Sequence, residues 1–93
     1  MTGADESFEL TVEISMYPVR DDYLAPIKGF IAQIGRHADL EIETTPTSTR
    51  IVGDYARVMA VLEEPMAVSY REFGTAVFVA KLIPGYAARR SSG

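Results

Sequence analysis

Hydrophobic and polar residues alternate in one segment near the start of the chain, from Phe8 to Tyr17. Every second position is apolar and the positions between are polar: Leu10, Val12, Ile14 and Met16 against Glu9, Thr11, Glu13 and Ser15. A period of two is typical of a β-strand that buries one face. We therefore predict a strand here that ends at Pro18, with the face opposite to the core formed by Thr11, Glu13, Ser15 and Tyr17.

Two other segments repeat their apolar residues every three or four positions, as amphipathic helices do. The first begins near Tyr23, after Asp21 and Asp22, which offer a carboxylate N-cap. Its apolar stripe is Leu24, Ile27, Ile31 and Ile34. The second follows the candidate N-cap Asp54, and its stripe is Tyr55, Val58, Leu62, Met66, Tyr70 and Phe73. Because Pro65 removes a helical hydrogen bond, we expect a kink or a break at that residue.

Three more segments show strand patterns. Residues 40–45 and 48–52 predict a hairpin, and the nearly all-apolar residues 75–82 predict a central or interface strand. Right-handed crossovers fold the order βαββαβ into a four-stranded antiparallel sheet with both helices on one face, which is an α+β ferredoxin-like sandwich. We expect one domain over residues 8–86, with flexible termini at 1–7 and 87–93.

Composition removes several classes of function. The 93 residues include no cysteine, so a disulfide framework, a thiolate metal site and a cysteine nucleophile are excluded. The net charge of −4 argues against nucleic acid, whose binding needs clustered basic residues. No apolar run is long enough to span a membrane, and the acidic start of the chain is unlike a signal peptide, so we expect a cytoplasmic protein without membrane insertion.

The residues also argue against catalysis and against a bound cofactor or metal. Ser15 has no partnering histidine, because His37 is the only one and is expected to cap the first helix. Asp21 and Asp22 have no third ligand at a suitable spacing to hold a metal ion. No glycine-rich phosphate loop is present.

The uncovered face of the sheet is the firmest candidate for a site. Glu13 and Ser15 are there either as the solvated half of a strand or as the floor of a small-molecule site beside Tyr17 and another subunit. Ser48 and Thr49 belong to a hydroxyl-rich stretch that serves a hairpin or, alternatively, offers hydrogen bonds toward Ser15. The apolar last strand indicates a subunit interface.

A set of motifs resembles the YkoF-like thiamin/hydroxymethylpyrimidine-binding family. The matching pieces, in order, are Glu13 to Pro18, Asp22-Tyr23, Pro26-Ile27, Ser48-Thr49, Ile51 to Tyr55, Val58-Met59 and Glu72 to Lys81. The resemblance implies a ferredoxin-like repeat that binds thiamin or its pyrimidine precursor without chemistry, in vitamin salvage or transport. It also implies that two repeats make the working unit, so this single repeat is expected to form a homodimer or homotetramer.

The resemblance implies a ligand-binding role for residues inside the matching motifs. These are Glu13, Ser15, Tyr17, Ser48, Thr49 and Phe78. An aminopyrimidine can exchange hydrogen bonds with hydroxyl and carboxylate groups and stack on an aromatic ring, and a thiazolium cation favours acidic or aromatic neighbours. The leading hypothesis is a non-enzymatic binder of a small cationic or pyrimidine ligand on the open sheet face. Two alternatives remain, an oligomeric interaction module without a ligand and a small ferredoxin-like dimeric enzyme.

Overall fold

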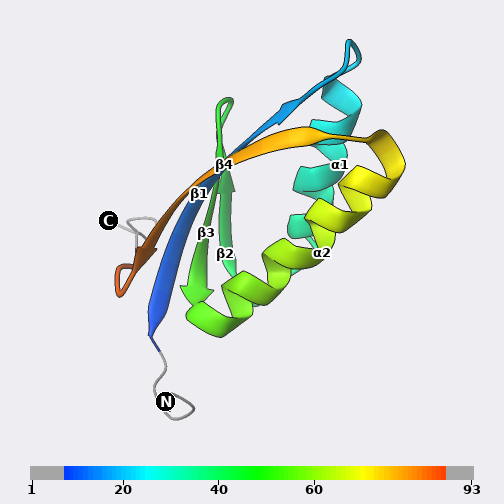
Figure 1. Ribbon diagram of the computed structural model, residues 1–93. Coiled ribbons are helices and arrows are strands. Elements are labelled where there is room, and N and C mark those ends of the chain that lie inside the picture. Colours follow the sequence, from blue (N-terminus) through cyan, green and yellow to red (C-terminus); the bar gives the residue numbers. More distant parts are fainter. Residues whose placement is uncertain (1–7, 88–93) are drawn as a thin grey trace.

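The structure is a computed structural model that describes residues 8–87 (Figure 1). Apart from Ala87, the segments predicted to be flexible lie outside these residues. Six elements follow in the order βαββαβ. They are β1 (Glu9–Pro18), α1 (Leu24–Ile34), β2 (Glu41–Thr44), β3 (Thr49–Asp54), α2 (Tyr55–Phe73) and β4 (Ala76–Pro84). All pairings are antiparallel in the strand order β2-β3-β1-β4, so the predicted ferredoxin-like fold is confirmed.

The pairing register assigns each strand residue to one face of the sheet, since residues opposite one another point the same way. Val12 lies opposite Ile51 on β3 and Leu82 on β4, and this set faces the helices. Glu13 lies opposite Arg50 and Lys81, and this set faces away from them. The two faces of β1 are therefore as predicted. Thr11 points to the open face yet is buried, because the chain after β4 returns across that corner and Thr11 Oγ1 donates to the Tyr86 carbonyl over 2.7 Å.

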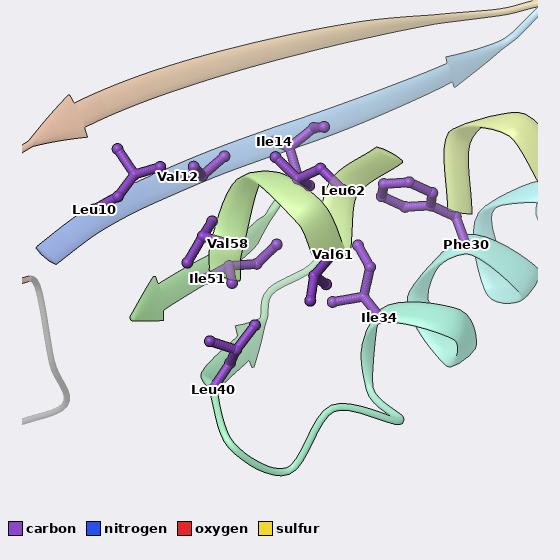
Figure 2. Packing of buried hydrophobic residues seen from close by; sticks show 10 residues of the cluster. All are labelled: Leu10, Val12, Ile14, Phe30, Ile34, Leu40, Ile51, Val58, Val61 and Leu62. Carbon is purple, nitrogen blue, oxygen red and sulfur yellow. The ribbon is translucent and has the colours of Figure 1, made fainter. Parts of the chain in front are cut away.

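The core fills the space between the helices and the sheet. Figure 2 shows Leu10, Val12 and Ile14 pointing from β1 toward the helices. The same cluster contains Phe30, Ile34, Leu40, Ile51, Val58, Val61 and Leu62. Burying a side chain of this size contributes roughly 1.5–3 kcal/mol, so this layer supplies most of the driving force for folding.

The buried stripe of each helix overlaps the predicted one only in part: Ile34 of α1, and Val58 and Leu62 of α2, are buried as predicted. In α1 the buried residues are Pro26, Phe30 and Ile34, whereas the first predicted residue, Leu24, is exposed. In α2 they are Val58, Val61, Leu62, Pro65 and Ser69, which leaves Tyr55 and Tyr70 exposed. The period of three and four was right, but apolar residues border both sides of each buried stripe, and the sequence pattern alone did not set its rotation.

The helix ends follow the predictions in part. Asp54 caps α2, accepting from the Arg57 backbone N–H at 3.4 Å, and Gly74 ends it with a φ of 90°. The caps predicted for Asp21 and Asp22 are wrong, because Tyr23 is the N-cap of α1 and no side chain caps it. Of the kink or break predicted at Pro65, the break is absent, since α2 is one helix from Tyr55 to Phe73 with Pro65 inside it. β4 is an edge strand and not a central one.

Candidate functional site

The site begins where β1 extends past β3. β1 pairs with β3 from Glu9 only as far as Ile14, but it pairs with β4 all the way to Pro18. Within residues 8–87, the last four residues of β1 thus have a strand on one side and none on the other. The tip of the β2–β3 hairpin and the start of α1 lie at this same end of the molecule (Figure 1).

A groove forms at this end, which we call the α1–hairpin groove. Its inner part has a volume of about 80 Å³ and lies between β1, α1 and the hairpin turn at Thr45–Thr49. Its outer part, about 420 Å³, is lined by Tyr17, Pro18, Arg20 and Tyr23. Met16, Ile27, Pro46 and Thr47 line both parts. The two parts are therefore continuous, and their volume is in the range of small-molecule sites.

The hairpin turn that walls the groove is held by hydroxyl groups. Thr45 Oγ1 accepts from the backbone N–H of Ser48 at 3.1 Å and of Thr47 at 3.3 Å. The Thr45 backbone N–H donates to the Ser48 carbonyl at 2.8 Å. Ser15 Oγ donates to the Thr47 carbonyl over 2.9 Å, which joins β1 to a turn 32 residues away in sequence. These bonds fix the groove wall before any ligand arrives.

The inner part of the groove combines an apolar floor with one well-placed hydroxyl. Ile14, Ile27, Phe30 and Ile31 supply the apolar surface. Thr49 also lines it and is only 4% exposed. Among residues 8–87, no hydrogen bond to the Thr49 hydroxyl is found, so this group is available to a ligand. Polar groups of this kind, few and fixed, are what orient a ligand in an apolar pocket.

The outer part of the groove is aromatic and carries a positive charge. Tyr17 and Tyr23 are each more than half exposed. The Arg20 guanidinium donates to the Phe73 carbonyl at 3.2 Å and lies over the Phe73 ring at 5.4 Å from its centroid. Its nearest carboxylate, Asp22, is 3.9 Å away, which is a weak ion pair at a surface. Arg20 therefore brings a positive charge to the lining of the outer part, with Asp22 close by.

The structure brings four of the six predicted site residues together and separates two. Ser15, Ser48 and Thr49 line the inner part of the groove and Tyr17 the outer part. Glu13 is on the open sheet face, where its carboxylate lies 3.5 Å from the Lys81 amine, and it does not line the groove.

Phe78 lies on the helix side, with its ring centroid 5.0 Å from that of Phe30. The expectation of one shared site on the open face is thus wrong for Thr49 and Phe78. Thr49 lies opposite Ile14 and Phe78 opposite Met16, and both of these β1 residues face the helices.

Several groove residues were not predicted. Thr45, Thr47, Arg20 and Tyr23 lie in the hydroxyl-rich turn and in the connection from β1 to α1. Thr45 and Thr47 belong to the hydroxyl-rich stretch whose hydrogen bonds were expected to reach Ser15, whereas no pattern singled out Arg20 and Tyr23. The overhang of β1 beyond β3, which creates the groove, depends on pairing register and carries no local sequence signal.

A second polar cluster lies at the far end of α1. The Arg57 guanidinium donates to both Asp39 carboxylate oxygens, at 2.7 and 3.2 Å, and lies 3.2 Å from His37 Nδ1. The hydrogen bond from Arg57 lowers the pKa of Asp39 below its ordinary value of 3.8. His37 therefore faces an arginine, and not the α1 carbonyls that its ring was expected to cap. In residues 8–87 no three carboxylate or histidine groups gather to hold a metal, and no helix is both long and apolar enough to cross a membrane.

Comparison with known proteins gives structural likeness only. No family model matches the chain, and neither does any curated protein. The SP2199 protein of Streptococcus pneumoniae is similar over 82% of this chain and 86% of its own, with 20% identity and a TM-score of 0.76. TM0486 of Thermotoga maritima, described as a proposed thiamine biosynthesis/salvage protein, is 23% identical over 86% of this chain and 85% of its own, with a TM-score of 0.70.

A domain of unknown function from Bacillus cereus, DUF77, is 11% identical, with a TM-score of 0.70 over 92% of this chain and 84% of its own. At these identities the likeness establishes the ferredoxin-like fold, and it is consistent with the YkoF-like resemblance at that level.

Proposed function

We propose that this protein binds hydroxymethylpyrimidine or thiamin, without chemical change, in the α1–hairpin groove. One observation carries the proposal: four residues chosen from the sequence for this ligand, Ser15, Tyr17, Ser48 and Thr49, line a single groove of suitable size. The likeness to TM0486, whose description concerns thiamine biosynthesis or salvage, supports the same class of ligand. In this proposal the ligand binds in the groove and not on the open sheet face, where the sequence had suggested a site.

The inner part of the groove suits an aminopyrimidine ring. Such a ring is flat and presents donors and acceptors in its own plane, so it needs apolar contacts on its faces and a polar partner at its edge. Ile27 and Phe30 supply the apolar contacts for the ring faces, and the Thr49 hydroxyl supplies the polar partner for the ring edge. A hydroxyl can act as donor or acceptor, so it can pair with a ring nitrogen or with the exocyclic amine.

The charge at the groove mouth favours a neutral ligand over a cation. Arg20 lines the outer part, while the acidic residue that was expected to attract a cation, Glu13, lies elsewhere and contacts Lys81. Like charges repel, so a cation gains less than a neutral ligand at this end of the groove. We therefore expect hydroxymethylpyrimidine, which has no thiazolium, to bind more tightly than thiamin.

Binding without catalysis fits the environment of Ser15. A serine nucleophile needs a base that takes its proton, but the Ser15 hydroxyl donates to the Thr47 backbone carbonyl. Its role here is to hold the turn that walls the groove. We also retain a homodimer or homotetramer in the proposal, because the resemblance implies paired repeats.

Isothermal titration of the full chain tests the proposal. Hydroxymethylpyrimidine, thiamin and an unrelated cationic heterocycle are titrated separately, and each ligand is recovered and weighed by mass spectrometry. We expect heat from the first two, the larger affinity for the first, and unchanged masses. Equal or absent heat for all three ligands would refute the proposal, and a mass change would refute binding without chemistry.

Two variants locate the site. Thr49→Val removes one hydroxyl at constant shape and should weaken hydroxymethylpyrimidine binding by about 2- to 10-fold, the value of one net hydrogen bond. Thr44→Val is the matched control, because Thr44 lies opposite Thr49 on β2 and does not line the groove. Glu13→Gln should leave affinity unchanged. If Glu13→Gln abolishes binding while Thr49→Val does not, the ligand is on the open face.

A further inference from the structure

The backbone of β1 has an unpaired edge inside the α1–hairpin groove. In an antiparallel sheet, successive residues turn their N–H and C=O groups toward opposite neighbours. The Gly85 N–H donates to the Glu9 carbonyl over 2.7 Å, on the β4 side of β1. The Tyr55 N–H donates to the Phe8 carbonyl over 2.9 Å, on the β3 side. Because both registers are regular, odd-numbered residues of β1 bond to β4 and even-numbered residues face the β3 side.

Met16 is an even-numbered residue of β1 that β3 does not reach. The β1–β3 pairing ends at Ile14, while β1 and β4 stay paired to Pro18. The N–H and C=O of Met16 therefore point away from β4, and Met16 lines both parts of the groove. Continuing the β3 register would bring Thr47 opposite Met16, but the Thr47 carbonyl accepts from the Ser15 hydroxyl instead. In the described part of the chain, no hydrogen bond to the Met16 backbone is found.

This free edge of β1 carries only one backbone donor. Pro18, the next even-numbered residue, has no N–H, and a proline on an edge strand stops further pairing. An added strand or an extended peptide needs a row of donors and acceptors, so this edge does not suit either. Met16 presents one N–H and one C=O that point the same way. Such a pair suits a small molecule with an acceptor and a donor on neighbouring atoms.

We propose that the Met16 backbone binds the amino-bearing edge of the pyrimidine and makes the groove selective for an aminopyrimidine. The inference rests on the proposed function and specifies a contact within it. The Met16 N–H donates to the ring nitrogen next to the amino group, and the amino group donates to the Met16 carbonyl. Unlike a hydroxyl, a backbone N–H and C=O cannot exchange roles, so this pair accepts one fixed pattern of acceptor and donor.

The Thr49 hydroxyl is placed to meet the far side of the same ring. Thr49 lies opposite Ile14, two residues before Met16, so about 7 Å along the strand separates the two polar positions. This spacing leaves room for one six-membered ring with its hydrogen bonds. The residues on either side of Met16, Ser15 and Tyr17, pair with β4 and hold its backbone in place before any ligand arrives.

NMR of the full chain labelled with ¹⁵N-methionine tests the contact, because the chain has only four methionines. Met59 and Met66, both inside α2, are internal references, and Met16→Leu assigns the Met16 signal. Without ligand, the Met16 amide should exchange with solvent faster than the two helical amides. With saturating hydroxymethylpyrimidine, it should shift downfield and exchange at least about tenfold more slowly, while the helical amides keep their chemical shifts.

A ligand analogue and a backbone variant test the selectivity. The analogue that lacks the amino group leaves the Met16 carbonyl unpaired and should bind at least about tenfold more weakly. Met16→Pro removes the N–H without removing a β1–β4 hydrogen bond and should weaken hydroxymethylpyrimidine binding by a similar factor. Thr44→Pro is the matched control, because the Thr44 N–H also faces away from its partner strand, at the outer edge of β2. If Met16→Pro does not fold, the analogue and the labelled amide still decide.

Two results overturn the Met16 contact. One is slow exchange of the Met16 amide in the free protein, since the amide would then already be paired. The other is equal affinity for hydroxymethylpyrimidine and for the analogue without the amino group. If hydroxymethylpyrimidine still binds in either case, the proposed function stands and only this contact fails. Absent binding of every ligand would overturn both.

Discussion

Gly53→Ala should destabilise the fold because a side chain at this position has no room. Gly53 lies buried in β3, opposite Leu10, on the side that faces the helices. A Cβ there would lie 2.4 Å from Leu40 Cδ2 and 3.4 Å from Val58 Cγ2. Carbon atoms do not approach to 2.4 Å, so Leu40, itself 8% exposed, must move. The clashing atom belongs to the Leu40 side chain, which can change rotamer, and not to the backbone.

The magnitude is a balance of two opposing effects. Inserting a methyl group into a packed core costs about 1–3 kcal/mol. Replacing glycine by alanine in a strand returns about 0.5–1 kcal/mol, because the unfolded chain loses freedom. The net loss is about 0–2.5 kcal/mol, centred near 1 kcal/mol, and for a chain of this size each kcal/mol lowers Tm by about 4–8 °C.

Urea unfolding at constant protein concentration measures the effect, and Gly29→Ala is the control. Gly29 lies inside α1, and its Cβ would meet only Phe73 Cε2 at 3.6 Å, an ordinary contact. Gly29→Ala should therefore stabilise the protein by about 0.5–1 kcal/mol. In a Leu40→Ala background, the Gly53→Ala penalty should vanish, since the clashing atoms are gone. Equal stability changes for the two glycine variants would refute the reasoning.

Three further predictions concern single polar contacts. Ser15→Ala removes the bond to the Thr47 carbonyl, so amides of the hairpin turn should exchange faster with solvent while overall stability falls by no more than about 1 kcal/mol. Asp54→Ala removes the α2 cap and should cost about 0.5–2 kcal/mol in urea unfolding, whereas Asp54→Asn should cost much less. Arg57→Ala should return the pKa of Asp39 toward 3.8 in an NMR titration of its carboxyl carbon. Because the folded pKa lies below that value, the ion pair contributes above pH 3.8 and is lost as the pH falls through the lower folded pKa. An unchanged Asp39 pKa in the Arg57 variant would show that the pair does not form in solution.

Local patterns in the sequence determined the elements and their order. The alternation in β1 fixed both its position and its two faces, because each apolar residue there has a polar neighbour and a shift by one would bury charges. The helix cap at Asp54 was also predictable, since it depends on a residue type suited to one backbone position. The order βαββαβ then limited the fold to one simple topology.

The tertiary structure alone decided where the helices face and where the candidate site lies. Both helices have apolar residues around more than half of their circumference, so the buried stripe depends on what packs against them. The groove exists because β1 continues four residues past its pairing with β3, and the hairpin turn crosses the gap to Ser15. Contacts between residues this far apart in sequence depend on strand register, which no local pattern of hydrophobic and polar positions contains.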